Sequence, residues 1–254
     1  MRQKLSAAFF VLSFAVVARG EWQVASSSSE SSTDRSVEHR HVVMRNETGA
    51  EATLDLAVFS PKSHSLRVFD ESVEPRADLA AVMERERCIA GTNGGYFDPG
   101  YAPVGLLVID GKAVAPFRKA HLLSAVLTAG KGRVQLLRSP EYSTKRNLGT
   151  ALQCGPFLVD HGEAVAGLND SRGARRTFVA VDGERAAIGF CSGATLAELG
   201  QMLATSGVIG AGKIQRAMNL DGGSSSAFWF DGGTRPLSIP AYKTVRNFLG
   251  VGPK

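Results

Sequence analysis

Three of the four Asp-Gly pairs, those at 110–111, 182–183 and 231–232, constrain the fold of this chain more than any other feature. Two-residue hairpin turns favour Asp-Gly because the central residues adopt positive φ. Strand-like residues flank the first two pairs, at 104–109 before 110–111 and at 177–181 and 186–190 around 182–183. The sequence therefore predicts successive hairpins and gives Asp110, Asp182 and Asp231 structural roles.

Alternating apolar residues extend this pattern, and two helices interrupt it. Ala52, Leu54, Leu56 and Val58 alternate and predict a hairpin with 66–69. Apolar spacing after Asp78 predicts a helix at 78–87, and the Thr195-x-x-Glu198 capping box predicts a second. Further strands are expected at 124–128, 133–137 and 152–159. We expect an α+β domain, sheet-rich and mixed or antiparallel, with two principal helices.

The N-terminal 41 residues differ in composition from the rest. Residues 1–20 carry Arg2 and Lys4, an apolar run and small residues at the end, as a cleaved signal peptide does. The run is short for a bilayer span, so we expect a secreted or periplasmic protein without a stable membrane anchor. Residues 21–41 are predicted to be a disordered Ser-rich tether in which His39 and His41 are solvated. The domain is predicted at 42–254.

Charge and cysteine content narrow the partners. The formal net charge is +5, and removal of Arg2, Lys4 and Arg19 with the signal peptide leaves +2. This small charge predicts no nucleic-acid partner. Cys88, Cys154 and Cys191 would allow one disulfide in an exported protein, although spacing does not choose the pair, and burial as small hydrophobes is expected for at least one.

Two segments share one construction, an Asn at a strand end followed by Gly-Gly and accompanied by Asp. They are Asn93-Gly94-Gly95 with Asp98, and 219–223, which contains Asn219, Asp221, Gly222 and Gly223. In an extended chain Asn219 and Asp221 share one face. The glycines let a ligand approach the backbone. Together with Arg176 between them in the sequence, these segments predict one polar site.

Four sequence blocks stand out at 92–97 (TNGGYF), 154–159 (CGPFLV), 176–182 (RTFVAVD) and 219–225 (NLDGGSS). They resemble the phosphodiester glycosidase family and occur in the family's order. The closing strand at 245–251 also resembles the end of that family, and the basic residue before it is Lys243. The resemblance implies hydrolysis of a sugar 1-phosphodiester at the anomeric carbon, with a sugar phosphate as substrate.

The resemblance also suggests roles. Asp221 is the expected catalytic carboxylate and Arg176 the phosphate clamp, because a guanidinium pairs with phosphate through two N–H groups. Asp98 is expected to be either a second carboxylate or a turn residue. Asn219 and Asn93 are expected to hold sugar hydroxyls or phosphate oxygens. The remaining expected substrate-binding residues are Gly94, Gly95, Tyr96, Thr177, Gly222, Gly223, Ser224 and Ser225.

Two alternatives stay open. The same oxygen donors, including Asp98 and Asp221, could hold a divalent cation in a phosphodiesterase that cleaves the P–O bond. A secreted carbohydrate-binding module without catalysis is the second alternative, although a hydrolase is favoured because Asp221, Asn219 and Arg176 are all present. No cofactor is predicted with certainty, and the sequence does not fix the oligomeric state.

Overall fold

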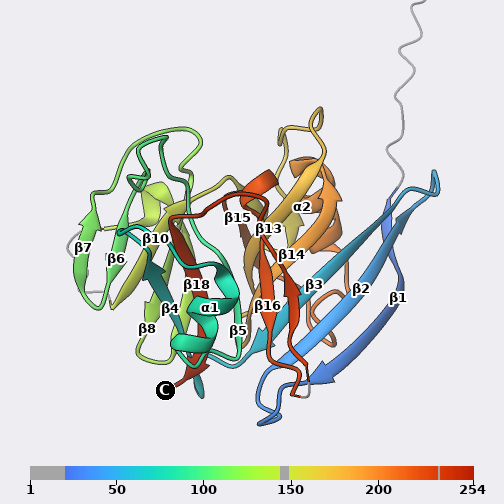
Figure 1. Ribbon diagram of the computed structural model, residues 1–254. Helices are drawn as coiled ribbons and strands as arrows, with labels where there is room; N and C mark the ends of the chain where they lie inside the picture. The colour runs from blue at the N-terminus through green and yellow to red at the C-terminus, as the bar shows by residue number, and fades with distance from the viewer. Residues whose placement is uncertain (1–20, 144–148, 234) are drawn as a thin grey trace, which may run out of the picture.

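Antiparallel β-sheet dominates the fold, as Figure 1 shows. The computed structural model describes residues 21–143, 149–233 and 235–254, so the predicted signal peptide lies outside the described residues. Within them, the strands form an eight-stranded sheet and two five-stranded sheets. All strand pairs are antiparallel, which confirms the α+β prediction and selects its antiparallel form.

The eight-stranded first sheet has the spatial order β1 (Trp22–Ser31), β2 (Glu38–Asn46), β3 (Glu51–Phe59), β14 (Ala186–Ala194), β13 (Ala174–Val181), β15 (Arg216–Asn219), β11 (Phe157–Asp160) and β12 (Glu163–Ala164). The second sheet has the order β7 (Lys112–Ala115), β6 (Leu107–Ile109), β10 (Thr150–Cys154), β8 (Ala125–Gly130) and β9 (Arg133–Arg138). The third has the order β17 (Leu237–Ile239), β16 (Phe228–Phe230), β5 (Ala90–Asn93), β18 (Asn247–Pro253) and β4 (His64–Asp70).

Both predicted helices are present, and each covers a different sheet. The helix α1 (Leu79–Arg85) begins at the Asp78 cap, whose side chain accepts from the Ala81 amide, and packs against the third sheet. The helix α2 (Leu196–Ala204) begins with the predicted Thr195–Glu198 capping box and packs against the first sheet. Two 3-10 turns, η1 (Ser139–Glu141) and η2 (Gly223–Ser225), complete the helical elements.

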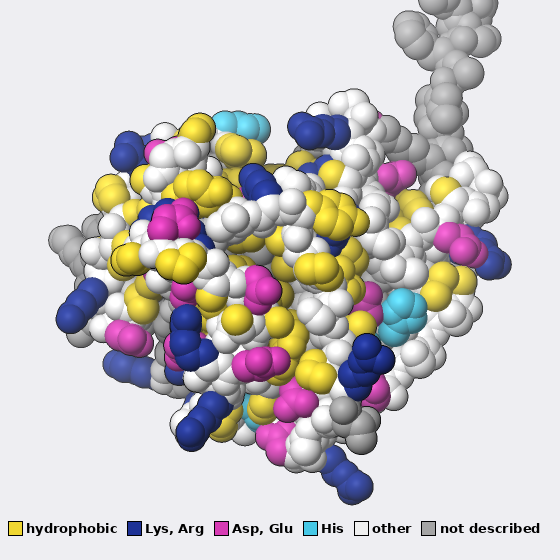
Figure 2. Space-filling view, in the orientation of Figure 1, with side chains coloured by type: hydrophobic (Ala, Val, Ile, Leu, Met, Phe, Trp, Pro, Cys, Tyr) yellow, Lys and Arg dark blue, Asp and Glu magenta, His cyan; other side chains and the backbone are white. Residues whose placement is uncertain are grey.

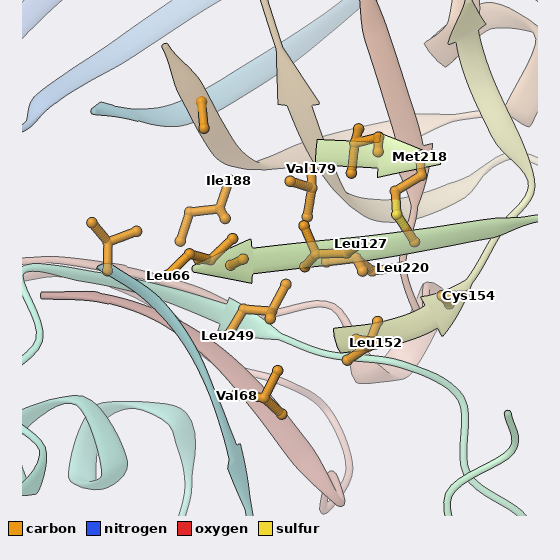
Figure 3. Packing of buried hydrophobic residues seen from close by; sticks show 14 of the residues in the cluster. Leu66, Val68, Leu127, Leu152, Cys154, Val179, Ile188, Met218, Leu220 and Leu249 are labelled. Atoms are coloured by element: carbon orange, nitrogen blue, oxygen red, sulfur yellow. The ribbon is translucent and has the colours of Figure 1, made fainter. Parts of the chain in front are cut away.

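The three sheets share one hydrophobic core. Figure 3 shows side chains from each sheet directed into the same space, among them Val179 from the first, Leu127 from the second and Leu249 from the third. All three are fully buried. Because Met218 and Leu220 also lie in this core, the residues between and after them, Asn219 and Asp221, are held at its edge.

The predicted tether at 21–41 is wrong. β1 pairs with β2 along its length, from Trp22 opposite Asn46 to Ser31 opposite Glu38. The serine side chains of β1 are mostly exposed, and Trp22 is buried. Low side-chain hydrophobicity did not prevent ordering, because main-chain hydrogen bonds hold this edge strand to its neighbour. The ordered domain therefore extends upstream of residue 42.

His39 is a correction of the same kind. Only 6% of His39 is exposed, and its two ring nitrogens lie 3.0 Å from Glu30 and from Asp55. Burial alone would lower the pKa of His39, but these two carboxylates raise it above its ordinary value. His41 Nδ1 lies 2.9 Å from the same Asp55 oxygen. These side chains thus connect the first three strands.

Two predictions about strands are wrong, because the strands pair differently from what the sequence suggested. The predicted hairpin between 52–58 and 66–69 does not form, because β3 pairs with β2 and β14 whereas β4 pairs with β18. The predicted strand at 152–159 is divided at Gly155 and Pro156 into β10 and β11, which belong to different sheets. The hairpins at 110–111 and 182–183 are confirmed.

The cysteines are free and buried, as expected for small hydrophobic residues. The disulfide left open for Cys88, Cys154 and Cys191 does not form. Burial raises the pKa of Cys154 and of Cys191 to about 12. Within the described part of the chain, no helix has both the length and the apolar character that a membrane span requires.

Candidate active site

Three hydrogen bonds from two other parts of the fold fix the backbone of Asp221. Its amide donates to the Gly94 carbonyl at 3.0 Å. Its carbonyl accepts from Asn93 Nδ2 at 2.6 Å and from Thr177 Oγ1 at 3.0 Å. The structure therefore brings together β13 and the two predicted segments, 93–95 and 219–223, which we call the Asn-Gly-Gly segments. With its main chain held in this way, Asp221 can present its side chain in a defined direction.

Asn93 supports the site from below its surface. It is fully buried, and its side-chain oxygen accepts from the Ala227 amide at 3.1 Å while its nitrogen donates to Asp221. Thr177 is also fully buried. The polar atoms of both side chains are thus used within the protein. The sequence suggested direct contact with substrate, whereas in the structure both side chains hydrogen-bond to other parts of the chain.

Asn247 in β18 supports the same corner. Its side-chain oxygen accepts from the Gly95 amide at 2.8 Å, and its carbonyl accepts from the Gly94 amide at 2.8 Å. A Cβ on Gly94 would lie 2.1 Å from that side-chain oxygen, so this position requires glycine. Asn247 was not among the site residues predicted from the sequence. The only signal was a polar residue in an otherwise apolar closing strand.

Asn219 has only part of its hydrogen-bonding capacity filled. Its side-chain nitrogen donates to the Gly155 carbonyl at 3.1 Å and approaches the Tyr96 hydroxyl at 3.3 Å. Its side-chain oxygen is buried and has no hydrogen-bond partner among the described residues. Tyr96 donates to Gly155 at 2.6 Å, and burial raises its pKa well above the ordinary value. Tyr96 is therefore a neutral structural donor here.

The Asp221 carboxylate is partly buried next to several polar groups. Burial raises its pKa above 3.8, while the nearby Ser225 hydroxyl, the Lys243 charge and the Gly222 amide oppose that rise. The hydroxyls of Ser225 and Ser226 are buried and make no well-formed hydrogen bond with a described residue. Buried polar atoms are rarely left unpaired. This corner therefore has spare capacity for water or a hydroxylated ligand.

Arg176 lies beside the glycine pair but is partly committed. Its Nε donates to the Ala194 carbonyl at 3.0 Å and its Nη2 to the Arg172 carbonyl at 2.7 Å. The remaining Nη1 would lie 3.5 Å from a Cβ built on Gly222. Burial lowers the pKa of Arg176 from a very high value, and the side chain stays charged. Nη1 and the second N–H of Nη2 make no hydrogen bond with a described residue, so these groups are left for the predicted phosphate clamp.

Asp98 does not join this group. The residue is exposed, and its carboxylate accepts from the Ala102 amide at 2.9 Å within its own loop. No hydrogen bond or ion pair between described residues connects it to Asp221. Of the two roles expected for Asp98, the structure therefore supports the turn residue, because a short side chain that caps its own loop is typical of Asp.

The glycine-serine turn after Asp221 is open on one side. Gly223 has φ +65° and begins η2, and the amides of Gly223 and Ser224 donate to no described residue. The Ser224 carbonyl accepts from the Tyr242 amide at 2.8 Å. The next residue, Lys243, is exposed, and its ammonium lies 4.9 Å from the centre of the Phe97 ring. The Gly222 amide and the Lys243 charge thus both favour the ionised form of the Asp221 carboxylate.

Charge on the molecular surface is mixed. On the face shown in Figure 2, Lys and Arg side chains alternate with Asp and Glu and form no continuous basic band. Among the described residues, no group of three or more His, Cys, Asp or Glu side chains is arranged to hold a metal ion. The oxygen atoms of Asp221, Asn219 and Ser225 are the remaining donors for a cation at this corner.

Solved structures share the fold at low sequence identity. A hypothetical protein from Synechocystis superposes with a TM-score of 0.64 at 16% identity. The match covers 86% of this chain and 62% of that protein, so this chain spans less than two thirds of its length. The catalytic domain of zebrafish N-acetylglucosamine-1-phosphodiester alpha-N-acetylglucosaminidase, auto-inhibited by its pro-peptide, gives 0.64 at 15% identity over 92% and 89%. An exported protein of Burkholderia pseudomallei gives 0.52 at 14% identity over 80% and 74%.

At these identities the structural similarity establishes the fold alone. A search of curated proteins finds no significant match. The sequence itself is more informative, because the family model for phosphodiester glycosidases matches residues 86–252, which is more than half of the chain. That range contains both Asn-Gly-Gly segments, Arg176 and Asp221. The chain belongs to the phosphodiester glycosidase family.

Proposed function

We propose that this protein is a secreted or periplasmic hydrolase that cleaves the anomeric C–O bond of sugar 1-phosphodiesters. The products are the free sugar and a phosphomonoester. Family membership and the shared fold with a phosphodiester glycosidase catalytic domain support this reaction class. The signal-like composition of residues 1–20 and an exported structural relative support the location.

The observation that carries the proposal is the arrangement of Asp221. Three hydrogen bonds hold its backbone, while its carboxylate is partly buried and has a raised pKa. Carboxylates with a shifted pKa, next to other polar groups, are often found at catalytic sites. We assign Asp221 the role of activating the attacking water or stabilising positive charge at the anomeric carbon.

The groups around Asp221 suit an anionic leaving group. Arg176 Nη1, Lys243 and the free amides of Gly223 and Ser224 can neutralise phosphate oxygens. Successive backbone N–H groups in a turn can form a concavity that favours anions. Asn219 is assigned to a sugar hydroxyl, because its buried side-chain oxygen lacks a partner among the described residues. Asn93 and Thr177 act through the position of Asp221.

The chemistry explains why one carboxylate suffices in this arrangement. When the bond from the anomeric carbon to the phosphate oxygen breaks, its electron pair leaves with the phosphomonoester. Water supplies the new oxygen on the sugar and releases a proton to Asp221 or to solvent. A phosphomonoester is a weakly basic anion, so charge stabilisation contributes more than protonation by a second acid. This mechanism needs no second carboxylate, and Asp98 is engaged within its own loop by the Ala102 amide.

The test is hydrolysis of a panel of sugar 1-phosphodiesters in ¹⁸O-water, with and without a chelator. We expect free sugar that carries the label, because the C–O bond breaks. Label in the phosphate would instead identify P–O cleavage, and loss of activity with chelator would add a divalent cation at the oxygen donors. Binding of substrate without product on prolonged incubation would identify a non-catalytic carbohydrate-binding protein.

A further inference from the structure

Arg175, the residue before the proposed phosphate contact Arg176, has no role in the reaction as described above. It is half-buried in β13, at the point where the register with β14 shifts between Ala174 and Arg176. Such irregularities redirect side chains and are common beside active sites. Arg175 forms no ion pair with a described residue. Main-chain carbonyls and aromatic rings hold its guanidinium instead.

The Arg175 guanidinium joins two segments at the active site. Its Nη2 donates to the Ser226 carbonyl at 2.6 Å and to the Pro240 carbonyl at 2.8 Å, so both of its N–H groups are used. Ser226 ends the turn η2 that follows Asp221, and Pro240 belongs to the connection between β17 and β18. Figure 1 shows this connection, in dark red, leading into β18. One side chain of β13 thus ties the turn to the connection.

Two aromatic rings hold the same guanidinium. Its Cζ lies 4.1 Å from the centre of the Tyr242 ring and 5.0 Å from the centre of the Phe190 ring. Phe190 is buried in the core, whereas 76% of Tyr242 is exposed. Contact between a guanidinium and an aromatic ring is favourable at these distances. Arg175 therefore links the packed first sheet to the exposed connection.

The main chain of Arg175 lies against the start of the same turn. A Cβ built on Gly222 would lie 3.3 Å from the Arg175 carbonyl oxygen, so the two segments pack closely. Between its ends, the turn is bonded to the connection, because the Tyr242 amide donates to the Ser224 carbonyl at 2.8 Å. The turn thus contacts Arg175 at both ends and the connection in the middle.

These two segments carry the groups that act on the Asp221 carboxylate. The turn provides the Ser225 hydroxyl and the Gly222 amide, and the connection provides the Lys243 charge. Burial raises the pKa of Asp221, and all three groups oppose that rise. Their effect depends on their distance from the carboxylate, because electrostatic interactions weaken with separation. The contacts of Arg175 therefore bear on the ionisation of Asp221.

The other titratable or charged groups near Asp221 are Tyr96, Cys154 and Arg176. Burial raises the pKa of Tyr96 and of Cys154, and the Asp221 charge adds to the rise, so both stay neutral in acid. Arg176 stays charged over the same range. Arg175 hydrogen-bonds with none of these three side chains. The contacts of its own side chain lead to Asp221 through the turn and the connection.

We propose that Arg175 is a positioning residue of the active site, which fixes the turn at 222–226 and the connection at 240–243 relative to each other and so places Ser225 and Lys243 beside the Asp221 carboxylate. This inference rests on the proposed function. Arg175 Nε is buried and both N–H groups of Nη2 are used, so no pair of N–H groups is left for bidentate contact with a phosphate.

The experiment measures the pH dependence of kcat/KM for a sugar 1-phosphodiester on the full chain. Arg175→Lys keeps the charge but ends one bond short of Nη2, and Arg175→Met keeps only the ring contacts. In both variants Ser225 and Lys243 are held less closely, so the acidic limb of the profile should move upward by roughly half a unit. A protein that is merely destabilised would lose rate without a shift of the limb. Arg133→Lys and Arg133→Met, at an exposed position in β9, are the matched controls and should leave the limb in place.

An unchanged limb in both Arg175 variants would overturn the proposal. A shift in Arg175→Met alone would also overturn it, because the charge would then act directly. Arg175 would be a phosphate contact if the variants lost rate on phosphodiesters but not on a neutral aryl glycoside, and the proposal would fail. If Arg175→Lys does not fold by circular dichroism, Tyr242→Ala replaces it, since it keeps the charge and removes one ring contact. The same upward shift is then expected, and its absence rejects the proposal.

If the wild type cleaves no sugar phosphodiester, the proposed function fails separately. The Asp221 carboxyl carbon is then titrated by ¹³C NMR, with its signal assigned by Asp221→Asn. A higher pKa of Asp221 in both Arg175 variants than in the wild type and the Arg133 controls supports the positioning role. A wild-type pKa in either Arg175 variant rejects it.

Discussion

The two Asn-Gly-Gly segments look equivalent in sequence, but the structure uses them differently. Around Asn93 every side-chain polar atom is bonded to the protein, and the amides of Gly94 and Gly95 are taken by Asn247. Around Asn219 a buried oxygen lacks a partner among the described residues, as do the nearby serine hydroxyls. The first segment is therefore a structural support, and the second is the one that we propose to contact substrate. Buried polar atoms without a hydrogen-bond partner distinguish the second segment from the first, although the two sequence patterns are alike.

The largest effect is expected at Asp221, which belongs to the second segment. Asp221→Asn should lower turnover by about 10²–10⁴-fold, the usual contribution of a general acid or base. Stability should not fall. Because the folded state raises the pKa of Asp221, the stability contribution of this group is greatest below the unfolded pKa and is lost as pH rises through the folded pKa.

Asp221→Asn places a neutral amide in this partly buried position. The variant therefore avoids the stability loss that ionised Asp221 causes at neutral pH. Steady-state rates and thermal melts at pH 7 measure both effects. A near-normal rate in Asp221→Asn would remove Asp221 from the chemistry and erase the difference between the two segments. A large drop in melting temperature would instead assign Asp221 to the support.

Arg176 should have the next largest effect. Lysine cannot reach the Ala194 and Arg172 carbonyls and still offer a nitrogen beside Gly222. Arg176→Lys should lower kcat/KM for phosphodiesters roughly 10–100-fold, the equivalent of one charge-assisted hydrogen bond. A neutral aryl glycoside should be affected much less. Arg172→Lys, at an exposed position, is the control, and equal losses on both substrates would reject the phosphate contact.

Alanine at the two asparagines tests the comparison directly. Asn93→Ala leaves the buried Ala227 amide without a partner and should lower the free energy of unfolding by about 1–3 kcal/mol more than Asn219→Ala does. In Asn219→Ala the Gly155 carbonyl keeps its bond from Tyr96, so the stability loss is smaller. Urea denaturation measures the difference. Equal losses would mean that both segments serve only as supports.

The smallest effect concerns pH. If ionised Asp221 is required, kcat/KM falls as pH drops through its raised pKa, above 3.8. Burial is the main cause of that rise, and the Lys243 charge opposes it. Lys243→Met should therefore move the acidic limb of the pH profile upward by a fraction of a unit. Lys112→Met, an exposed change in β7, should leave the limb in place. A downward shift in Lys243→Met would contradict the arrangement.

Local chemistry was predictable from the sequence. The Asp78 cap, the Thr195–Glu198 capping box and the hairpins at 110–111 and 182–183 depend on interactions between neighbours in the chain. The convergence of the two Asn-Gly-Gly segments was also expected. The predicted site residues divide, however, into fully buried ones such as Asn93 and partly buried ones such as Asp221.

Long-range partners were not predictable. A strand pattern does not specify which strand it joins, so residues 152–159 appeared as one strand although they divide between two sheets. Asn247 was missed because its contact with Gly94 and Gly95 crosses most of the chain. His39 was predicted to be solvated, and this prediction failed because the groups that surround it are distant in the sequence. They are the carboxylates of Glu30 and Asp55 and the rings of Phe228 and Phe230.

The serine-rich strand β1 protects the rest of the sheet from association. It occupies the outer edge, where β2 would otherwise expose a row of unpaired amides and carbonyls. An uncovered edge next to apolar β2 residues such as Val42 and Met44 is a template for pairing between molecules. Serine hydroxyls, in contrast, keep the new edge well hydrated. We therefore expect this polar strand to keep the sheet edge soluble, at a distance along the sheet from the candidate active site.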